Sequence, residues 1–463
     1  MNARAREKPR ADPRWTLAAC VLASSLSFVE GSVLNVALPA IRASYGAGAA
    51  EVQWVVNAYL LPLSALLLLG GALGDHYGRR RLLVIGTAIF AVSSLVCALA
   101  PGLGFLLTAR AVQGIGAALL LPNSLALLNA AFEGEKRGRA VGIWAAAGAA
   151  SAAVAPLIGG WLVDHAGWPA IFYINLPIAA GAILLAVRFV SESRETSGGR
   201  TDYVGASVAT LGLACATYGL TRWSSSGNFD ALAILAIVAG LLFLGLFLLI
   251  EHRRGDRAMM PLALFTGLCF SGLNLLTFLL YGAFGAAMLL IPYVLISGAG
   301  YSPVEAGLAM LPLPVLMASL SPLMGGLVGR TGPRLPLTIG PLIVAAGFIL
   351  AWLIEPGVSY WASAFPSVLV MSVGMTIAVA PLTASVLGSV SERHVAMASG
   401  FNSAVARVGG LIATALLGAV LASEGSQLFT GFHAGMTVAA GVAAAAALVA
   451  LTMLGGVKMK NAA

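Results

Sequence analysis

The sequence predicts an all-α membrane protein with fourteen transmembrane helices, and three observations lead to this prediction. Of its 463 residues, 59% are hydrophobic and 10% are charged, whereas a soluble domain carries about 25% charged residues. Apolar runs repeatedly reach the roughly 20 residues that a helix needs to cross a bilayer, and they lack the alternation of barrel strands. Basic residues gather in short clusters between these runs, as orientation signals do in proteins with several membrane spans.

Proline, glycine and charged residues divide the chain into the predicted spans. An even number of spans places both termini on one side of the membrane. Of the 26 Lys and Arg residues, only Arg42 and Arg222 fall in loops on the opposite side, and Arg110 and Arg407 lie within spans. Because basic loops stay on the cytoplasmic side, we expect both termini in the cytoplasm. The protein is expected in the inner or plasma membrane. The predicted spans cover residues 15–39, 52–74, 82–100, 104–130, 139–163, 169–190, 203–222, 231–250, 267–297, 304–328, 335–354, 361–386, 396–422 and 433–456.

A weak internal repeat organises these spans. Residues 71–80, GALGDHYGRR, and residues 325–334, GGLVGRTGPR, share the first Gly, a Leu, the turn Gly and the last Arg. Both segments end a span on the same predicted side, which indicates a parallel repeat of two six-helix bundles. Asp75 of the first copy is Gly329 in the second. The predicted organisation is a tail at 1–14, bundles at 15–190 and 267–456, an inserted helix pair at 203–250, a linker at 251–266 and a tail at 457–463.

The sequence gives no signal for a metal site, an enzyme or a nucleic-acid binder. The cysteines, Cys20, Cys97, Cys215 and Cys269, lie inside apolar runs without ligand spacing. The net charge of +8 resides in loop clusters of the kind that orient membrane proteins, which disfavours nucleic acid as a partner. No phosphate-binding loop of the G-x-x-x-x-G-K type and no H-E-x-x-H or G-x-S-x-G segment is present. We therefore expect no cofactor and an ion gradient as the source of energy.

Several segments resemble one known family. Residues 71–80 are similar to the loop signature of the major facilitator superfamily. Residues 34–39 (LNVALP), 110–116 (RAVQGIG), 155–160 (APLIGG), 168–177 (WPAIFYINLP) and 301–307 (YSPVEAG) resemble its fourteen-span drug:proton antiporter branch. Two positions depart from the pattern: Ala155 stands where the family usually has Gly, and His76 where it usually has Arg.

The resemblance implies a secondary transporter that works by alternating access. Its expected partners are protons, the lipid bilayer and a small amphipathic or cationic organic molecule, which a monomer exports in the manner of a multidrug efflux pump. A dedicated exporter of one metabolite, antibiotic, siderophore or lipid would have the same sequence features. A channel is disfavoured because a two-half repeat with a cytoplasmic latch suits alternating access, and a membrane-embedded enzyme because no paired intramembrane acids are present.

Glu30 is the acid deepest within a predicted span. A carboxylate in hydrocarbon is costly as an anion, so it is a natural carrier of one proton, and the resemblance associates an acid at this position with proton coupling or cation recognition. Arg110 lies at a comparable depth in its span, and we expect it to bias the protonation of Glu30. The alternatives are a protonated Glu30 that serves structure and an Arg110 that packs between helices.

Three further groups of residues are predicted to take part. Asp75 lies at the C-terminal end of its span, where its charge opposes the helix dipole and needs a partner, so residues 71–80 are expected to form a conformational latch. Small residues of the fifth span are expected to form a seam between the halves, with ordinary helix packing as the alternative. The latch comprises Gly71, Asp75, Gly78, Arg79 and Arg80; the seam comprises Gly148, Ala155, Pro156, Gly159 and Gly160; candidate cavity residues are Asn35, Trp54, Tyr59, Gln113, Phe284 and Arg407. For Arg407 a structural ion pair is the open alternative, and for the aromatic residues a lipid-belt or core position.

Overall fold

The computed structural model describes residues 12–194, 202–226, 228, 230–255, 262–390 and 395–454. Within these residues the fold is all-helical, as predicted, and each predicted span contains one helix or two consecutive helices. Eleven described helices are long and apolar enough to cross a membrane, or twelve if the bent α2 counts as one span, so the number of fourteen spans stays a prediction. The predicted tail 457–463, residues 1–11 of the other tail and residues 256–261 of the linker lie outside the described residues.

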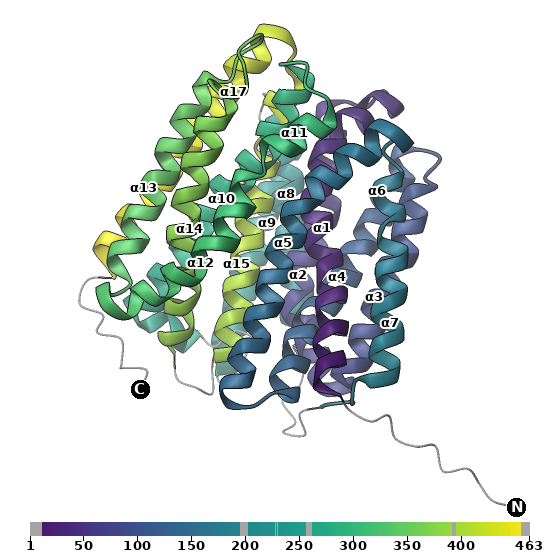
Figure 1. Ribbon diagram of the computed structural model, residues 1–463, viewed down its shortest axis with the longest axis vertical. Coiled ribbons are helices and arrows are strands. Elements are labelled where there is room, and N and C mark those ends of the chain that lie inside the picture. The colour runs from purple at the N-terminus through teal and green to yellow at the C-terminus, as the bar shows by residue number, and fades with distance from the viewer. Residues whose placement is uncertain are drawn as a thin grey trace, which may run out of the picture.

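The helices form two bundles with a pair between them (Figure 1). The N-terminal bundle consists of α1 (Pro13–Tyr45), α2 (Ala49–Tyr77), α3 (Arg79–Ala98), α4 (Leu103–Ala131), α5 (Gly134–Ala166), α6 (Ala170–Tyr173) and α7 (Asn175–Phe189). The pair is α8 (Tyr203–Ser226) and α9 (Ala231–Arg254). The C-terminal bundle consists of η2 (Leu262–Thr266), α10 (Leu268–Ser297), α11 (Pro303–Ala309), α12 (Pro312–Thr331), α13 (Arg334–Leu350), η3 (Ala351–Leu353), α14 (Ala364–Gly388), α15 (Val395–Ala415), α16 (Gly418–Ala422) and α17 (Gly425–Met453).

The loop between α1 and α2 lies at one end of the molecule, the α1–α2 end, and the loop between α2 and α3 lies at the other, the α2–α3 end. At the α1–α2 end, α1 stops at Tyr45, and Gly46 closes the helix with a left-handed φ of 60°. At the α2–α3 end, α2 stops at Tyr77. Helix α1 begins and α17 ends at this α2–α3 end, which is the lower end in Figure 1. Both ends of the described helical chain therefore lie on the same side, as the alternation of spans requires.

Close helix packing builds the N-terminal bundle. Helix α4 packs against both α2 and α3. A Cβ atom at Gly114 of α4 would lie 2.3 Å from the carbonyl oxygen of Tyr59 in α2, so this crossing admits no side chain at that position. Small residues allow such close approach in membrane helices, where packing rather than water exclusion holds the helices together. The close crossing places the middle of α4 directly beside α2.

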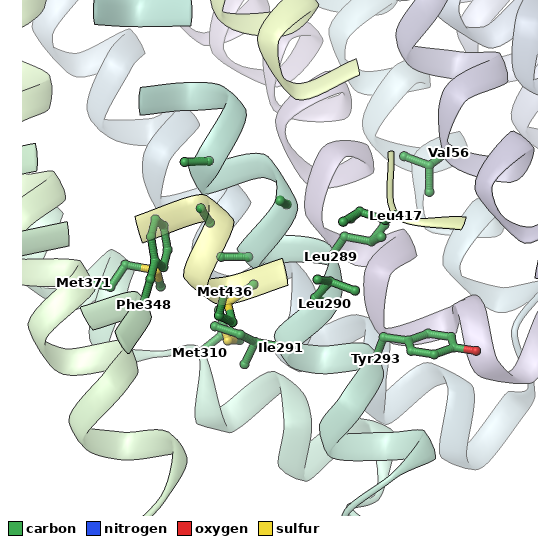
Figure 2. Close-up of a cluster of buried hydrophobic side chains, with 14 of the residues drawn as sticks. Val56, Leu289, Leu290, Ile291, Tyr293, Met310, Phe348, Met371, Leu417 and Met436 are labelled. Atoms are coloured by element: carbon green, nitrogen blue, oxygen red, sulfur yellow. The ribbon is translucent and has the colours of Figure 1, made fainter. Parts of the chain in front are cut away.

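Two buried hydrophobic clusters support the bundles. The larger cluster extends through the C-terminal bundle, and its members in the N-terminal bundle, such as Leu38 and Val56, come from the α1–α2 end. Figure 2 shows part of this cluster, from Val56 and Leu417 to Phe348. The second cluster lies almost wholly in the N-terminal bundle, between the buried centre and the α2–α3 end. The two bundles are therefore joined by apolar packing at the α1–α2 end.

Candidate functional site

A buried carboxylate and a buried guanidinium meet inside the N-terminal bundle. Glu30 of α1 and Arg110 of α4 are each 1% exposed, and Arg110 Nη1 donates to Glu30 Oε1. Asn175, the first residue of α7, donates to the other carboxylate oxygen over 3.0 Å. The structure thus brings together the two residues predicted for proton coupling, and it adds Asn175, which the sequence placed only within a family motif.

Several acceptors fix the orientation of Arg110. Its Nε donates to the carbonyl oxygen of Val55 over 3.0 Å, and its Nη1 donates to Gln113 Oε1 over 2.6 Å. Gln113 in turn donates to the Ser94 hydroxyl over 2.8 Å. A guanidinium held in this way directs Nη1 toward both Gln113 and Glu30 in a fixed orientation.

Tyr59 of α2 lies beside this network and not in an open cavity. The guanidinium carbon of Arg110 lies 4.6 Å from the centre of the Tyr59 ring, within cation–π range. The Tyr59 hydroxyl lies 2.9 Å from the hydroxyl of Ser27, and it is within electrostatic reach of Arg407 in α15. Tyr59 therefore lies between the buried pair and the C-terminal bundle.

The predicted latch is held by two carboxylates. Arg79 Nη2 lies 2.7 Å from Asp75 Oδ1 across one helical turn. Glu192, which follows α7, accepts the backbone N–H of Arg80 over 2.9 Å. The sequence predicted that the charge of Asp75 would need a partner. The described contacts of Asp75 come from its own loop, and the additional carboxylate, Glu192, belongs to the same bundle.

The two latch glycines have different surroundings. Gly78 has a φ of 111°, a conformation that side chains rarely adopt, and a Cβ there would lie 2.7 Å from the carboxyl group of Glu192. Gly71 is less constrained, because a Cβ there would lie 3.5 Å from Pro122 of α4, at ordinary contact distance. Gly78 is thus the glycine that the turn requires.

The small residues of α5 face two different neighbours. A Cβ at Gly160 would lie 2.3 Å from the carbonyl oxygen of Pro303 in α11, and one at Gly307 of α11 would lie 2.4 Å from that of Pro156. Gly148 and Gly159 instead face α1, and Ala155 is buried in the larger hydrophobic cluster. Pro156 and Gly160 therefore lie between the halves, whereas the other predicted seam residues pack within or beside the N-terminal bundle.

Polar side chains that the sequence did not single out connect the bundles at the α1–α2 end. Gln53 of α2 donates to the carbonyl oxygen of Thr414 in α15 over 2.6 Å, and the Thr414 hydroxyl donates to Asn57 Oδ1 over 2.6 Å. Arg42 donates to the Tyr293 hydroxyl over 2.8 Å. Figure 2 shows Tyr293 at the edge of the apolar cluster, with its hydroxyl directed away from the other labelled side chains. These contacts close the α1–α2 end.

The remaining candidate cavity residues are dispersed. Arg407 lines a cavity of about 320 Å³ formed by α10, α14 and α15. Asn35 donates to the carbonyl oxygen of Met288 in α10 over 3.0 Å, as part of the α1–α2 closure. Trp54 lies 6.4 Å from Tyr218 of α8, measured between ring centres, and Phe284 packs against the larger hydrophobic cluster. The described residues contain no group of three His, Cys, Asp or Glu side chains that would hold a metal ion.

Comparison with known proteins agrees with this architecture. The family model of the Major Facilitator Superfamily matches residues 20–414. The chain belongs to the major facilitator superfamily. It is 34% identical to the multidrug resistance protein Stp of Mycobacterium tuberculosis over 88% of this chain and 76% of Stp. It is 30% identical to the tetracenomycin C resistance and export protein of Streptomyces glaucescens over 91% of this chain and 78% of that protein.

Solved structures support the same fold. A bacterial homologue of the human lysosomal transporter Spinster, crystallised inward-facing and unoccupied, superposes with a TM-score of 0.65 at 17% identity, covering 95% of this chain and 96% of that one. At this level of identity the likeness concerns the fold alone. Among the curated relatives of this major facilitator, several carry names of drug or antibiotic resistance and export proteins. The chain is therefore a multi-pass membrane protein of a transporter family.

The residues that close the α1–α2 end left a weak signal in the sequence of this major facilitator. Gln53 and Asn57 are polar and four positions apart, so they share one face of an otherwise apolar helix. Their partner Thr414 is a single hydroxyl among small residues, with no spacing that points to α2. The spacing of Gln53 and Asn57 on α2 was a signal that the sequence analysis did not use, and their pairing with Thr414 required the structure.

Proposed function

We propose that this protein is a proton-coupled exporter of small amphipathic organic molecules that works by alternating access. The observation that carries the proposal is the buried Glu30–Arg110 pair, held by Gln113 and Asn175 in the part of the chain that the structure describes. An ionisable acid within the membrane usually marks a proton path. If its partner can bind or release the acid, the protonation of the acid is linked to the conformation of the protein. The drug and antibiotic resistance names of the relatives support the class of cargo.

The proposed cycle follows from the contacts at the α1–α2 end. With both termini in the cytoplasm, as the basic loops favour, this end faces outward and the described state is closed to the outside. In the proposed cycle this state follows the release of the Glu30 proton to the cytoplasm, and Glu30 pairs with Arg110. Opening of the α1–α2 end would separate the bundles, expose Glu30 to the outer solution and allow it to take up a proton. Inward proton flow thereby drives export, and no other cofactor is needed.

Inverted membrane vesicles with an acidic interior test this proposal. The probes are two xanthene dyes of similar size, the cation rhodamine 123 and the anion fluorescein, each added outside the vesicles. Wild-type vesicles are expected to accumulate at least one dye, and collapse of the pH gradient should abolish the accumulation. Glu30→Gln, which cannot ionise, should remove the dependence on the gradient.

A matched control keeps this test specific. Glu355 is an exposed acid between η3 and α14, so Glu355→Gln changes the same functional group outside the buried network. We expect it to transport as the wild type does. Gradient-driven accumulation that survives in Glu30→Gln would remove Glu30 from the coupling mechanism. Wild-type vesicles that accumulate neither dye under any gradient would contradict the proposed export of amphipathic xanthenes.

A further inference from the structure

The cavity beside Arg407 carries a charge that the proposed proton site does not use. Arg407 lies twelve residues after Val395, where α15 begins, so it is about 18 Å along the helix from the α2–α3 end. It lines the cavity of about 320 Å³ together with side chains of α10 and α14. A guanidinium at this depth is costly without a counter-charge, and such residues usually mark a substrate or ion pathway.

No carboxylate among the described residues forms an ion pair with Arg407. The described ion pairs engage Arg42, Arg79, Arg80, Arg110, Arg222 and Arg254. Glu392 lies outside the described residues. The proximity of Tyr59 supplies a phenol and no negative charge. The charge of Arg407 is thus available to a ligand.

The walls of the cavity suit an oxyanion better than a cation. Its described lining holds one cation, Arg407, and no acid. The hydroxyls of Tyr281, Ser399 and Ser403 are additional donors around the guanidinium, while Val386 and Leu387 supply apolar surface. A cation entering this site would meet a like charge in a medium of low dielectric, where charges of the same sign repel each other more strongly than in water.

The wall that carries Arg407 is fixed. Asn402, five residues earlier on α15, donates through its amide nitrogen to Asn274 Oδ1 and to the Thr277 hydroxyl of α10, over 3.1 and 2.7 Å. A Cβ at Gly409 would lie 2.6 Å from the carbonyl oxygen of Phe278, so α15 and α10 also touch through their backbones. A rigid wall lowers the cost of ordering a charged side chain around a ligand.

We propose that this cavity binds an amphipathic organic anion, with Arg407 pairing with its carboxylate or phenolate and the neighbouring hydroxyls donating to it. The inference rests on the proposed export function for its physiological role, and it replaces the cationic cargo considered from the sequence. A membrane potential that is negative inside favours the export of an anion. Protonation of Glu30 removes a negative charge from the N-terminal bundle, so it would favour the binding of an anion and not oppose it. Proton uptake and anion binding must therefore be coupled through the conformation of the Glu30–Arg110 pair.

Cysteine labelling measures the charge preference of the cavity without a transport assay. Ser403 is exposed and lines the cavity, so Ser403→Cys is introduced after replacing the four native cysteines by Ser. The purified protein is reacted with an anionic sulfonatoethyl and a cationic trimethylammonioethyl methanethiosulfonate. Arg407→Gln is expected to lower the ratio of the anionic to the cationic rate about tenfold, since a nearby unit charge contributes 1 kcal/mol or more. Arg407→Lys should keep the ratio within about threefold, because the charge remains.

Dye uptake into inverted vesicles then separates this inference from the proposed function. Arg407→Gln should lose fluorescein uptake and keep rhodamine 123 uptake, with a wild-type melting temperature as the check on folding. An unchanged labelling ratio in Arg407→Gln would overturn the inference, as would a wild type that takes up rhodamine 123 in preference to fluorescein. If the ratio falls but neither dye is driven by the pH gradient, the anion site stands and the proton-coupled export of the dyes fails.

Discussion

Each bundle carries an arginine within a membrane-spanning helix, Arg110 in one and Arg407 in the other, and only Arg110 is paired with a described carboxylate. In the N-terminal bundle, Arg110 is 1% exposed and donates to Glu30, to Gln113 and to the carbonyl oxygen of Val55. In the C-terminal bundle, Arg407 lines a cavity, and no described carboxylate pairs with it. The charge of Arg110 is neutralised by Glu30 within the protein, whereas the charge of Arg407 is available to a ligand that enters the cavity.

This difference separates two tasks that a coupled transporter must perform. A proton site needs a partner whose release is tied to a conformational change, and a fixed network around Arg110 provides one. A substrate site needs a group that is unsatisfied until cargo arrives, because only differential binding can shift the equilibrium between states. The comparison can be tested by changing each arginine, and the expected effects differ in size.

Removal of the side-chain charge should affect stability far more at Arg110 than at Arg407. Arg110→Met leaves Glu30 buried without its partner, which costs about 3–5 kcal/mol for a buried pair. Arg407→Met removes an unpaired charge from the membrane interior and should cost less than about 1 kcal/mol or stabilise the protein. Thermal unfolding of the two variants in detergent measures the difference. The double variant Glu30→Gln/Arg110→Met should recover most of the loss, and equal melting temperatures of the two single variants would refute the comparison.

Replacement by lysine distinguishes geometry from charge. Arg110→Lys keeps the charge but loses the planar fork that reaches three acceptors, and each charge-assisted hydrogen bond contributes about 1.5–3 kcal/mol. We expect a loss of about 3 kcal/mol in unfolding free energy. Arg407→Lys should leave stability unchanged and retain anion preference. Chemical denaturation of both proteins in the same detergent gives the measurement, and tolerance of lysine at position 110 would show that geometry is not needed there.

The sequence predicted the N-terminal site better than the C-terminal one for a physical reason. Depth along a straight helix is readable from residue counts, so Glu30 and Arg110 could be placed at the same level, and the structure joins them. Whether Arg407 had a partner depended on which faces of α10, α14 and α15 meet, and spacing within one helix does not determine that. Glu192 was missed because it lies in a polar segment after α7, where an acid carries no signal of its own.

A substitution that opens the α1–α2 end should change the access of reagents to the cavity beside Arg407 while both Arg110 and Arg407 stay unchanged. Gly160→Leu forces a side chain into the carbonyl oxygen of Pro303, and such overpacking costs about 1–3 kcal/mol in the closed state. We expect a shift toward the opposite state and slower labelling of Ser403→Cys from the α2–α3 end, by threefold or more. Gly142→Leu is the matched control, since it lies on the same helix and a Cβ there has no neighbour within 4 Å. Equal labelling rates in the two variants would contradict the assignment of Gly160 to the closure.

Arg42, a third arginine, lies at the α1–α2 end, and its substitution should change the stability of the protein least. Arg42 donates to the Tyr293 hydroxyl over 2.8 Å and lies 3.3 Å from Glu424, whose side chain is 81% exposed. Because water screens this pair, Arg42→Gln should lower the unfolding free energy by about 0.5 kcal/mol, and Glu424→Gln by less. Melting curves at low and high salt measure the two losses. The loss in Arg42→Gln should persist at high salt, because the contact with the neutral Tyr293 is retained there. If high salt abolishes the loss of stability in Arg42→Gln entirely, then the contribution of Arg42 to the contact between the bundles comes from its attraction to Glu424 and not from its contact with the Tyr293 hydroxyl.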